Sequence, residues 1–319
     1  MNDLSGKTVV ITGASSGAGR AIAVELAKNG ARLVLGARRE QALEEVAAEC
    51  RSLGGDAHAV VTDTRDAEAV HRLLRKALEL DGKVDVWINN AGVLAAGELE
   101  QVPAAVNEAV IRTNLIGYIH GAHAVLPVFK RQGQGILINN ISIGGWFPTP
   151  YMTAYCASKF GLRGYSESLK GELKDYPHIH VCDLYPAFLD TPGMQHSANF
   201  TGKQLSPSPP LYDPRKVASA VVRLISRPRS KTTLGAFPVF LRMASLVFPV
   251  LSRSITASLI KNYLKGAAPT VHTSGNVLQP VDYGTGIDGG WRNVSLKPAP
   301  RTRLLLFAAA AGLLLLGRR

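Results

Sequence analysis

The alternation of strand-like and helix-like segments over the first 190 residues constrains the fold of this chain more than any other feature. Short apolar runs rich in β-branched residues predict strands at residues 8–12, 32–35, 57–61, 84–89, 135–141 and 180–184. Longer stretches between them predict helices at residues 20–29, 40–53, 66–80, 104–115, 118–130 and 153–173. Strands that alternate with helices in this way form βαβ units with parallel strands. The sequence therefore predicts an α/β fold with one doubly wound parallel sheet and helices on both faces.

Beyond the sixth predicted strand the pattern becomes less regular. Residues 191–212 are rich in proline, serine and glycine and predict a long substrate loop, and residues 234–264 are apolar and basic. We predict one domain at residues 1–265, followed by a C-terminal extension. The extension is divided into a linker at 266–303, which has no clear periodicity, and an apolar helix at 304–317.

The charge of the chain is concentrated in its last third. Residues 215–319 contain 16 Lys and Arg against two acidic residues, a net charge of +14, while residues 1–214 contain 20 against 22. Such asymmetry indicates an anionic partner, either a nucleic acid or a membrane surface. No nucleic-acid-binding motif is found in the basic third, so we predict a membrane surface and no nucleic acid.

Residues 304–316 form an uninterrupted apolar run with arginines on both sides. A helix of this length would span about 20 Å, less than the hydrocarbon core of about 30 Å. A helix that is apolar all round must be buried either in protein, its own or a second copy's, or in lipid. We favour lipid contact and a candidate membrane anchor. Because the first strand begins at residue 8 and leaves no room for a secretory signal, we expect the cytoplasmic side of that membrane.

The cysteines and histidines do not predict a metal site. Cys50, Cys156 and Cys182 are far apart in the sequence, and the eight histidines show no ligand spacing. Three such cysteines cannot form a disulfide framework either. We expect a protein of a reducing compartment without a metal centre.

A glycine-rich turn follows the first strand and opens the first helix. It reads TGASSGAG, with glycines at 13, 17 and 19. Glycines at such a place let the backbone approach a diphosphate, whose charge the helix N-terminus stabilises. The spacing differs from Gly-x-Gly-x-x-Gly, and an ordinary glycine-rich turn is the alternative. The context between strand and helix favours a Rossmann-type dinucleotide site.

The end of the second strand indicates which dinucleotide would bind. An NAD site has an acidic residue about 20 residues beyond the glycines, where it binds the ribose 2′-hydroxyl. This chain has Ala37 there, followed by Arg38 and Arg39. A guanidinium pairs with a 2′-phosphate, so the sequence favours NADP(H). The alternative is two solvated arginines, partly neutralised by Glu40.

Tyr155 and Lys159 lie four residues apart on a predicted helix and therefore share a face. A tyrosine hydroxyl titrates near pH 10, and a neighbouring ammonium lowers that pKa and makes the hydroxyl a usable acid near neutrality. Such a pair by itself is typical of an ordinary helix surface, so its meaning depends on the other motifs.

Taken in order, these motifs resemble the short-chain dehydrogenase/reductase family over roughly residues 5–230. Besides the glycine turn and the Tyr-x3-Lys pair, Ser142 precedes Tyr155 by thirteen residues, which is the usual separation in the family. The remaining matches are Asp63, Asn89, Asn90, Ala91, Gly92, Asn114, Pro186, Ala187 and Thr191.

The resemblance implies a role for each catalytic residue. Tyr155 would be the general acid that protonates the carbonyl oxygen, and Lys159 would lower its pKa and hold the nicotinamide ribose. Ser142 would hydrogen-bond the substrate oxygen, and Asn114 would order a water behind Lys159 for proton relay.

The resemblance also implies the cofactor contacts. Ser15, Ser16 and the glycine turn would hold phosphates, Asp63 would face the adenine, and Thr191 would contact the carboxamide. Asn90, Ala91, Gly92 and Pro186 would line the cofactor. Two residues depart from the family pattern: Ala187 replaces a frequent glycine, and Ile141 replaces the first of two common serines. Neither change removes a reacting group.

Together these observations predict an NADP(H)-dependent oxidoreductase that interconverts a ketone or aldehyde and an alcohol, with Tyr155 as general acid and base. Trp146, Phe147, Pro148 and Tyr151 predict an apolar pocket wall, and the basic, apolar segment 234–264 suggests a pocket that opens toward a membrane. We therefore expect a lipophilic substrate, such as a steroid, a retinoid or a long-chain keto-lipid.

Two other functions remain open at this stage. A soluble reductase of 3-oxoacyl thioesters or xenobiotic carbonyls would need no membrane. A non-catalytic NADP-binding scaffold is a function of a different class, and the intact set of Asn114, Ser142, Tyr155 and Lys159 argues against it. The resemblance also implies a homo-oligomer, because relatives of this fold commonly form dimers and tetramers.

Overall fold

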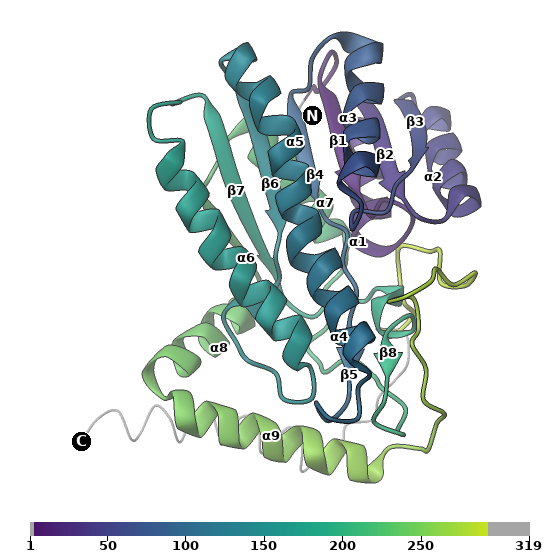
Figure 1. The fold of residues 1–319 in the computed structure, drawn as a ribbon, viewed down its shortest axis with the longest axis vertical. Coiled ribbons are helices and arrows are strands. Elements are labelled where there is room, and N and C mark those ends of the chain that lie inside the picture. Colours follow the sequence, from purple (N-terminus) through teal and green to yellow (C-terminus); the bar gives the residue numbers. More distant parts are fainter. Residues whose placement is uncertain (1–2, 293–319) are drawn as a thin grey trace.

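Seven parallel strands form the central sheet, in the order β3-β2-β1-β4-β6-β7-β9 (Figure 1). The computed structural model describes residues 3–292. The strands of this sheet are β1 Thr8–Thr12, β2 Arg32–Ala37, β3 Asp56–Val61, β4 Val86–Asn89, β6 Gly135–Asn140, β7 Ile179–Pro186 and β9 Lys231–Leu234.

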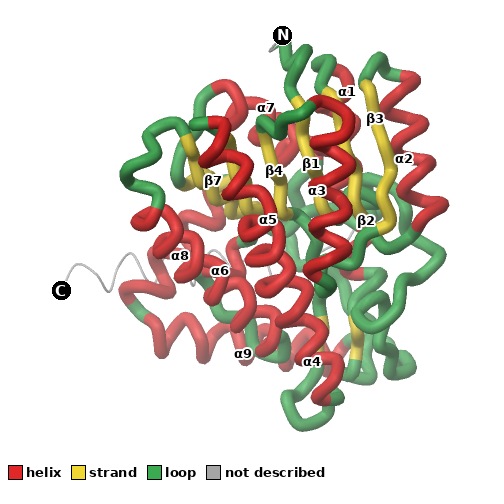
Figure 2. The backbone as a smooth tube through the Cα atoms, turned by 45° about the horizontal axis from the view of Figure 1, so that its top comes forward, coloured by secondary structure: helices red, strands yellow, loops and turns green. Residues whose placement is uncertain are grey.

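Helices cover both faces of this sheet (Figure 2). The helices α1 (Gly17–Lys28), α2 (Glu40–Ser52) and α7 (Arg215–Ser226) pack on one face, and α3 (Ala67–Asp81), α5 (Gly117–Gln132) and α6 (Thr153–Glu172) pack on the other. Side chains alternate along each strand, so Val9 and Ile11 point to the first group of helices and Val10 points to the second. This arrangement confirms the predicted doubly wound α/β fold.

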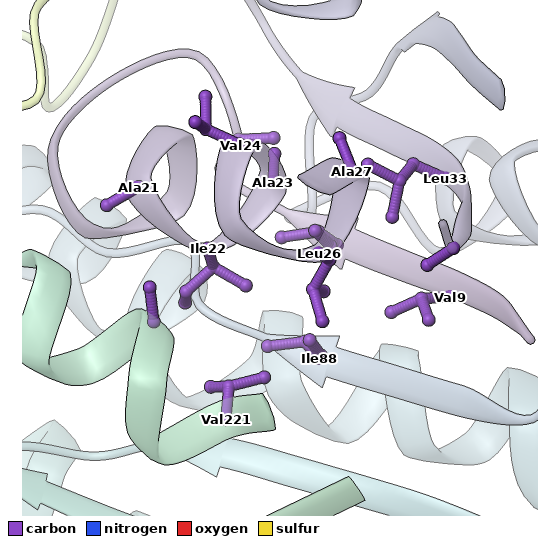
Figure 3. Close-up of a cluster of buried hydrophobic side chains, with 14 of the residues drawn as sticks. Val9, Ala21, Ile22, Ala23, Val24, Leu26, Ala27, Leu33, Ile88 and Val221 are labelled. Carbon is purple, nitrogen blue, oxygen red and sulfur yellow. The ribbon is translucent and has the colours of Figure 1, made fainter. Parts of the chain in front are cut away.

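The core under α1 fixes the position of that helix (Figure 3). Ile22 and Leu26 of α1 are fully buried, in one cluster with Val9 of β1, Ile88 of β4 and Val221 of α7. Burying a side chain of this size stabilises a fold by about 1.5–3 kcal/mol. The N-terminus of α1 is therefore held firmly at the end of β1.

The strand order reverses between β1 and β4. From β1 the chain continues outward to β2 and β3, then returns to β4 and continues in the opposite direction to β6 and β7. Ligands of open α/β sheets bind in the crevice at the carboxyl ends of the strands where the order reverses in this way. The glycine turn after β1 and the loop after β4 lie at this point.

Residues 104–132 form a continuous helix, where the sequence predicted two. Helix α4 (Ala104–Ile111) passes through a π-helical turn, Arg112–Ile116, directly into α5. Gly117, at the predicted break, keeps helical dihedral angles. A Cβ atom on Gly117 would lie 2.8 Å from Thr64 Oγ1. The glycine at this position therefore permits close packing and does not end the helix.

Several short elements were not predicted. Strand β9 pairs with β7, and its four residues KTTL are too few to show a periodicity. Within the predicted loop 191–212, the structure has a 3-10 turn, Pro192–Met194, and a two-residue strand β8 (Ala198–Asn199) that pairs with β5 (Ala95–Ala96). This loop is therefore partly ordered by pairing with a distant segment.

The apolar segment 234–264 folds into two helices, α8 (Ala236–Val247) and α9 (Pro249–Gly266), and α9 crosses the carboxyl end of the sheet in Figure 1. Within residues 3–292 no helix is both long enough and apolar enough to span a membrane. The predicted helix at 304–317 lies outside the described residues. Residues 267–292, which we call the strap, contain no helix or named strand.

Candidate active site

A cavity of about 850 Å³ lies at the carboxyl edge of the sheet. It brings together almost all of the residues that the sequence singled out. Its lining includes Gly13, Ser15, Ser16, Gly17, Gly19, Arg38, Arg39, Asp63, Asn90, Ala91, Gly92, Ser142, Tyr155, Lys159, Pro186, Ala187 and Thr191. Asn114 is not in this lining and is fully buried behind it.

The glycine turn and the loop after β4 are in backbone contact. Gly13 has a φ of +68°, and a Cβ on it would lie 2.6 Å from the Cα of Ala91. Asn90 donates from Nδ2 to the carbonyl oxygens of Thr12 and Gly13, each at 3.1 Å. Its Oδ1 accepts from Asn140 Nδ2 at 2.8 Å. A side chain at residue 13 would therefore separate the two loops that form the floor of the cavity.

Ser142 and Tyr155 meet at the other end of the cavity. Ser142 has a φ of +106°, which is rare for a residue other than glycine, and its Oγ accepts from the backbone N–H of Gly144 at 3.2 Å. Tyr155 lies in the first turn of α6. Burial raises the pKa of Tyr155 to about 12, and a hydrogen bond with the Ser142 side chain opposes this rise. The phenol is thus held protonated beside a second hydroxyl.

Lys159 is buried next to this pair, with 4% of its surface exposed. Its Nζ lies 5.8 Å from the centre of the Tyr155 ring and 5.1 Å from that of Tyr118, and it donates to the carbonyl oxygen of Asn140 at 3.4 Å. Burial lowers the pKa of Lys159 to about 7. The ammonium is close enough to favour a Tyr155 phenolate when it is charged, and this role remains a prediction.

Asn114 occupies the π-helical turn behind the cavity. Its side-chain amide forms hydrogen bonds with both backbone groups of Val93. Oδ1 accepts from the N–H at 2.8 Å, and Nδ2 donates to the carbonyl at 2.9 Å. Gly92 lies between the cavity and Asn114, since a Cβ there would be 3.5 Å from Asn114 Oδ1 and 4.0 Å from Lys159 Nζ. Turns of the π type are frequent at functional sites. The predicted water relay itself is not tested by this arrangement.

Asp63 is positioned at the opposite end of the cavity from Tyr155, near Arg38. Its carboxylate accepts from the Arg65 side chain, with Nε at 2.9 Å, and from the Arg65 backbone N–H at 3.0 Å. Burial alone would raise the pKa of Asp63, but these hydrogen bonds and the charges of Arg65 and Arg38 lower it. This carboxylate therefore stays ionised at the edge of the site.

Arg38 and Arg39 donate hydrogen bonds to carbonyl oxygens of the strap. The sequence did not predict this contact. Arg38 donates to the carbonyl of Asn276 at 2.5 Å, and Arg39 donates to those of Val281 and Tyr283 at 2.7 and 2.9 Å. The interpretation of residues 267–292 as a linker is therefore corrected: this part of the chain packs on the domain. The sequence of residues 267–292 shows neither helix nor strand periodicity, so this packing could not be predicted from it.

The predicted apolar wall is confirmed in part. Phe147 and Tyr151 line the cavity, but Trp146 and Pro148 do not. The Trp146 ring lies against two guanidinium groups. The centre of the ring is 3.8 Å from Cζ of Arg242 and 4.2 Å from Cζ of Arg163. The ring therefore holds α8 against α6. Helices α8 and α9 add further apolar side chains to this wall, namely Phe237, Leu241, Leu259, Ile260 and Leu264.

Comparison with known proteins identifies the family. The sequence profile named short chain dehydrogenase matches residues 7–201, which is more than half of the chain. The chain belongs to the short-chain dehydrogenase/reductase family. The protein is accordingly an oxidoreductase of this family, and the family's motifs converge on the cavity described above.

Three similar proteins show the range of the family. The uncharacterized oxidoreductase YxnA of Bacillus subtilis is 30% identical over 91% of this chain and 83% of its own. The 11-beta-hydroxysteroid dehydrogenase A of Sesamum indicum is 37% identical over 59% of this chain and 54% of its own length. Among solved structures, an alcohol dehydrogenase from the archaeon Thermococcus sibiricus, complexed with 5-hydroxy-NADP, is 30% identical with a TM-score of 0.63, over 72% of this chain and 95% of that one.

The burial of Lys159 predicts how stability depends on pH. Its pKa is lowered on folding from 10.5 to about 7, so between these values the unfolded chain binds more protons than the folded one. The contribution of Lys159 to the free energy of unfolding is therefore fully present above pH 10.5, and it is lost as the pH falls through 7. Without added nucleotide, the free energy of unfolding should rise by on the order of 2 kcal/mol from pH 7 to 9.

Urea denaturation at a series of pH values measures this rise. The Lys159→Met variant should lose most of it, and Lys130→Met, at an exposed position on α5, should keep it. An equal rise in wild type and in Lys159→Met would show that Lys159 does not titrate in this range.

Proposed function

We propose that the protein is an NADP(H)-dependent oxidoreductase that interconverts a lipophilic ketone or aldehyde and the corresponding alcohol. The observation that carries this proposal is that Ser142, Tyr155 and Lys159 line the same cavity as the glycine turn and two arginines. One half of the cavity thus offers phosphate-binding groups, and the other offers proton donors.

The residues of the first half fit a dinucleotide with a 2′-phosphate. The glycines at 13 and 19 let the turn fold tightly against the loop after β4, because a Cβ on Gly19 would overlap the Gly13 carbonyl and Asn90. Helix α1 begins at Gly17, and the positive end of its dipole would favour a diphosphate beside this turn. Arg38 and Arg39 line the cavity at the end of β2 and would pair with a 2′-phosphate. When bound, NADP(H) supplies the hydride chemistry, which no side chain can provide.

The protein's own groups move the proton and orient the substrate. The Tyr155 hydroxyl would donate its proton to the carbonyl oxygen during reduction and take it back during oxidation. Ser142 would donate a hydrogen bond to the same oxygen and fix its position. A charged Lys159 would stabilise the phenolate left on Tyr155, which offsets the burial that holds the phenol protonated.

The lining of the cavity supports an apolar substrate. The apolar part of the wall includes Phe147, Phe188 and Met194, together with the apolar side chains that α8 and α9 contribute to the lining. A pocket lined in this way binds apolar molecules, with a few polar groups that set their orientation. A steroid, a retinoid or a long-chain keto-lipid fits this description better than a small polar carbonyl compound.

The exposed face of α8 and α9 supports docking on a membrane with anionic lipids. These two helices contain no acidic residue, and Arg253, Lys261 and Lys265 of α9 supply positive charge. Apolar side chains that are between about a third and two thirds exposed accompany them, namely Val239, Phe240, Met243, Leu246, Val247, Val250 and Leu251. A basic, apolar surface beside the cavity would let a lipophilic substrate enter from the membrane.

Removal of the Tyr155 hydroxyl should abolish turnover and spare cofactor binding. In Tyr155→Phe we expect kcat for reduction to fall by about 10²–10⁴-fold, because the proton donor is lost, while NADPH affinity changes little. NADPH oxidation with steroid ketones, retinal, a long-chain keto-lipid and a 3-oxoacyl thioester measures this. The matched control is Tyr165→Phe, further along α6, which should retain activity.

The same panel tests the alternatives. Turnover of the thioester alone would favour the soluble reductase over our substrate class. Tight NADPH binding without turnover of any carbonyl compound would favour the non-catalytic scaffold.

Loss of the two arginines should change the cofactor preference. The Arg38→Ala, Arg39→Ala double variant should weaken NADPH binding by at least about tenfold and NADH binding much less, because NADH has no 2′-phosphate for a guanidinium to bind. Titration of each nucleotide by fluorescence measures both affinities. An equal loss for the two nucleotides would remove the 2′-phosphate assignment.

Disruption of the exposed apolar face should release the protein from lipid. The Leu246→Glu, Val250→Glu variant should cosediment with phosphatidylserine vesicles several-fold less than wild type, because both residues are more than half exposed and a carboxylate is expelled from the lipid interface. Leu99→Glu, at an exposed position near α4, is the control and should sediment like wild type. Equal sedimentation of all three proteins would contradict membrane docking through α8 and α9.

A further inference from the structure

The strap follows a long path over the nucleotide half of the cavity. In Figure 1 it is the yellow-green segment that leaves the end of α9 and rises toward α2 and α1. Early in this path Thr273 pairs with Asn199 of β8, and the N–H of Asn276 donates to the His196 carbonyl at 2.8 Å. Near its end, the Trp291 indole donates to the carbonyl of Thr191 at 3.2 Å. The strap is therefore tied to the domain on both sides of the cavity.

Between these two ends the strap contacts the groups assigned to phosphate binding. Its carbonyl oxygens accept from Arg38 and Arg39, as described above. The carbonyl of Gly286 accepts from the N–H of Gly17, the first residue of α1, at 2.8 Å, and that of Thr285 accepts from Arg20 at 3.0 Å. The strap thus crosses from the end of β2 to the start of α1, the two places where phosphates of the cofactor would lie.

Glycines let the strap lie directly on the domain. A Cβ on Gly284 would overlap the His196 ring, and a Cβ on Gly275 would overlap the His196 carbonyl. The His196 Nε2 is 2.8 Å from the carbonyl oxygen of Tyr283. Because His196 is itself buried, the strap packs directly against the interior of the domain at this point.

The strap lines the cavity without filling it. Asn276, Pro280 and Val281 are part of the lining of the 850 Å³ cavity, next to Arg38 and Asp63. A segment that filled the nucleotide half would have separated these residues from the open space. The strap therefore acts as an outer wall, opposite the glycine turn and the end of β2.

A cluster of charges fastens the end of the strap. Arg292 donates to Asp190, Asp213 and Asp288, at 2.9, 3.0 and 2.6 Å. Arg215, at the start of α7, donates to Asp288 at 2.8 Å. Asp190 is 1% exposed and also accepts from the backbone N–H groups of Gly289, Trp291 and Arg292. We call Arg292 and its three carboxylate partners the latch.

We propose that the strap is part of the cofactor site: it closes over the adenosine half of the bound dinucleotide, and the latch must open before the cofactor can exchange. This inference rests on the proposed use of NADP(H). Because a dinucleotide under the strap is enclosed between two backbone walls, its release requires the strap to move. Residues in the latch therefore control how fast the cofactor leaves without touching it.

The rate of NADPH dissociation tests this directly. NADPH bound to the full-length protein is displaced with excess NADP⁺ in a stopped-flow fluorimeter. Arg292→Gln should raise the dissociation rate constant about tenfold, because charge-assisted hydrogen bonds that hold the strap closed are lost. Arg223→Gln removes a guanidinium from an exposed position on α7 and should leave the rate unchanged.

Hydrogen exchange of the wild-type protein gives a second readout that needs no variant. Amides of residues 273–289 should exchange more slowly with saturating NADPH and also with 2′,5′-ADP, which represents the adenosine half alone. Nicotinamide mononucleotide should leave them unchanged, since it has no adenosine to be covered.

Each outcome decides the proposal. Faster dissociation in Arg292→Gln, together with protection by 2′,5′-ADP, supports it. An unchanged dissociation rate, or tighter NADPH binding in Arg292→Gln, overturns it, because tighter binding would mean that the strap competes with the cofactor. Absence of NADPH binding to the wild type would overturn the proposed function and the strap's role with it.

Discussion

The close backbone contact between the turn after β1 and the loop after β4 is the constraint on which the rest of the site depends. It exists because Gly13 has no side chain where Ala91 approaches, and because the Asn90 amide bridges the carbonyls of Thr12 and Gly13. This contact sets the start of α1 at the point where the strand order reverses. On the far side, Gly92 in the same loop lies between the cavity and Asn114. One contact thus fixes both the phosphate-binding end and the proton-transfer end of the cavity.

The electrostatics of the site follow from how deeply it is enclosed. Burial raises the pKa of Tyr155 and lowers that of Lys159, so both groups are pushed toward their neutral forms. Asp63, an acidic residue of the cavity lining, is already paired with Arg65 at the other end. A negative charge that develops on Tyr155 or on a substrate oxygen would therefore be the natural partner of a protonated Lys159. The pair is arranged so that each group ionises more easily when the other does.

The sequence was sufficient to predict site residues that follow regular strands, because strand periodicity and motif order together place such residues at one edge of a sheet. It therefore predicted six of the seven strands of the sheet, and the cavity brings together most of the site residues that it named. It could not predict contacts made by irregular backbone, such as carbonyls of the strap on Arg38. It also misassigned Trp146, because an aromatic residue after a catalytic serine fits a pocket wall as well as it fits the stack between Arg163 and Arg242.

The segments after β9 add two further walls to the cavity. Helices α8 and α9 contribute apolar side chains to its lining, and the strap contributes Asn276, Pro280 and Val281. Several cations of the basic third act inside this structure: Arg242 stacks on Trp146, and Arg215 and Arg292 pair with aspartates. The local charge available to attract a membrane is therefore smaller than the +14 of residues 215–319 suggests. The proposed membrane docking would then depend on the exposed apolar side chains of α8 and α9 as much as on charge, and other side chains of these helices line the cavity.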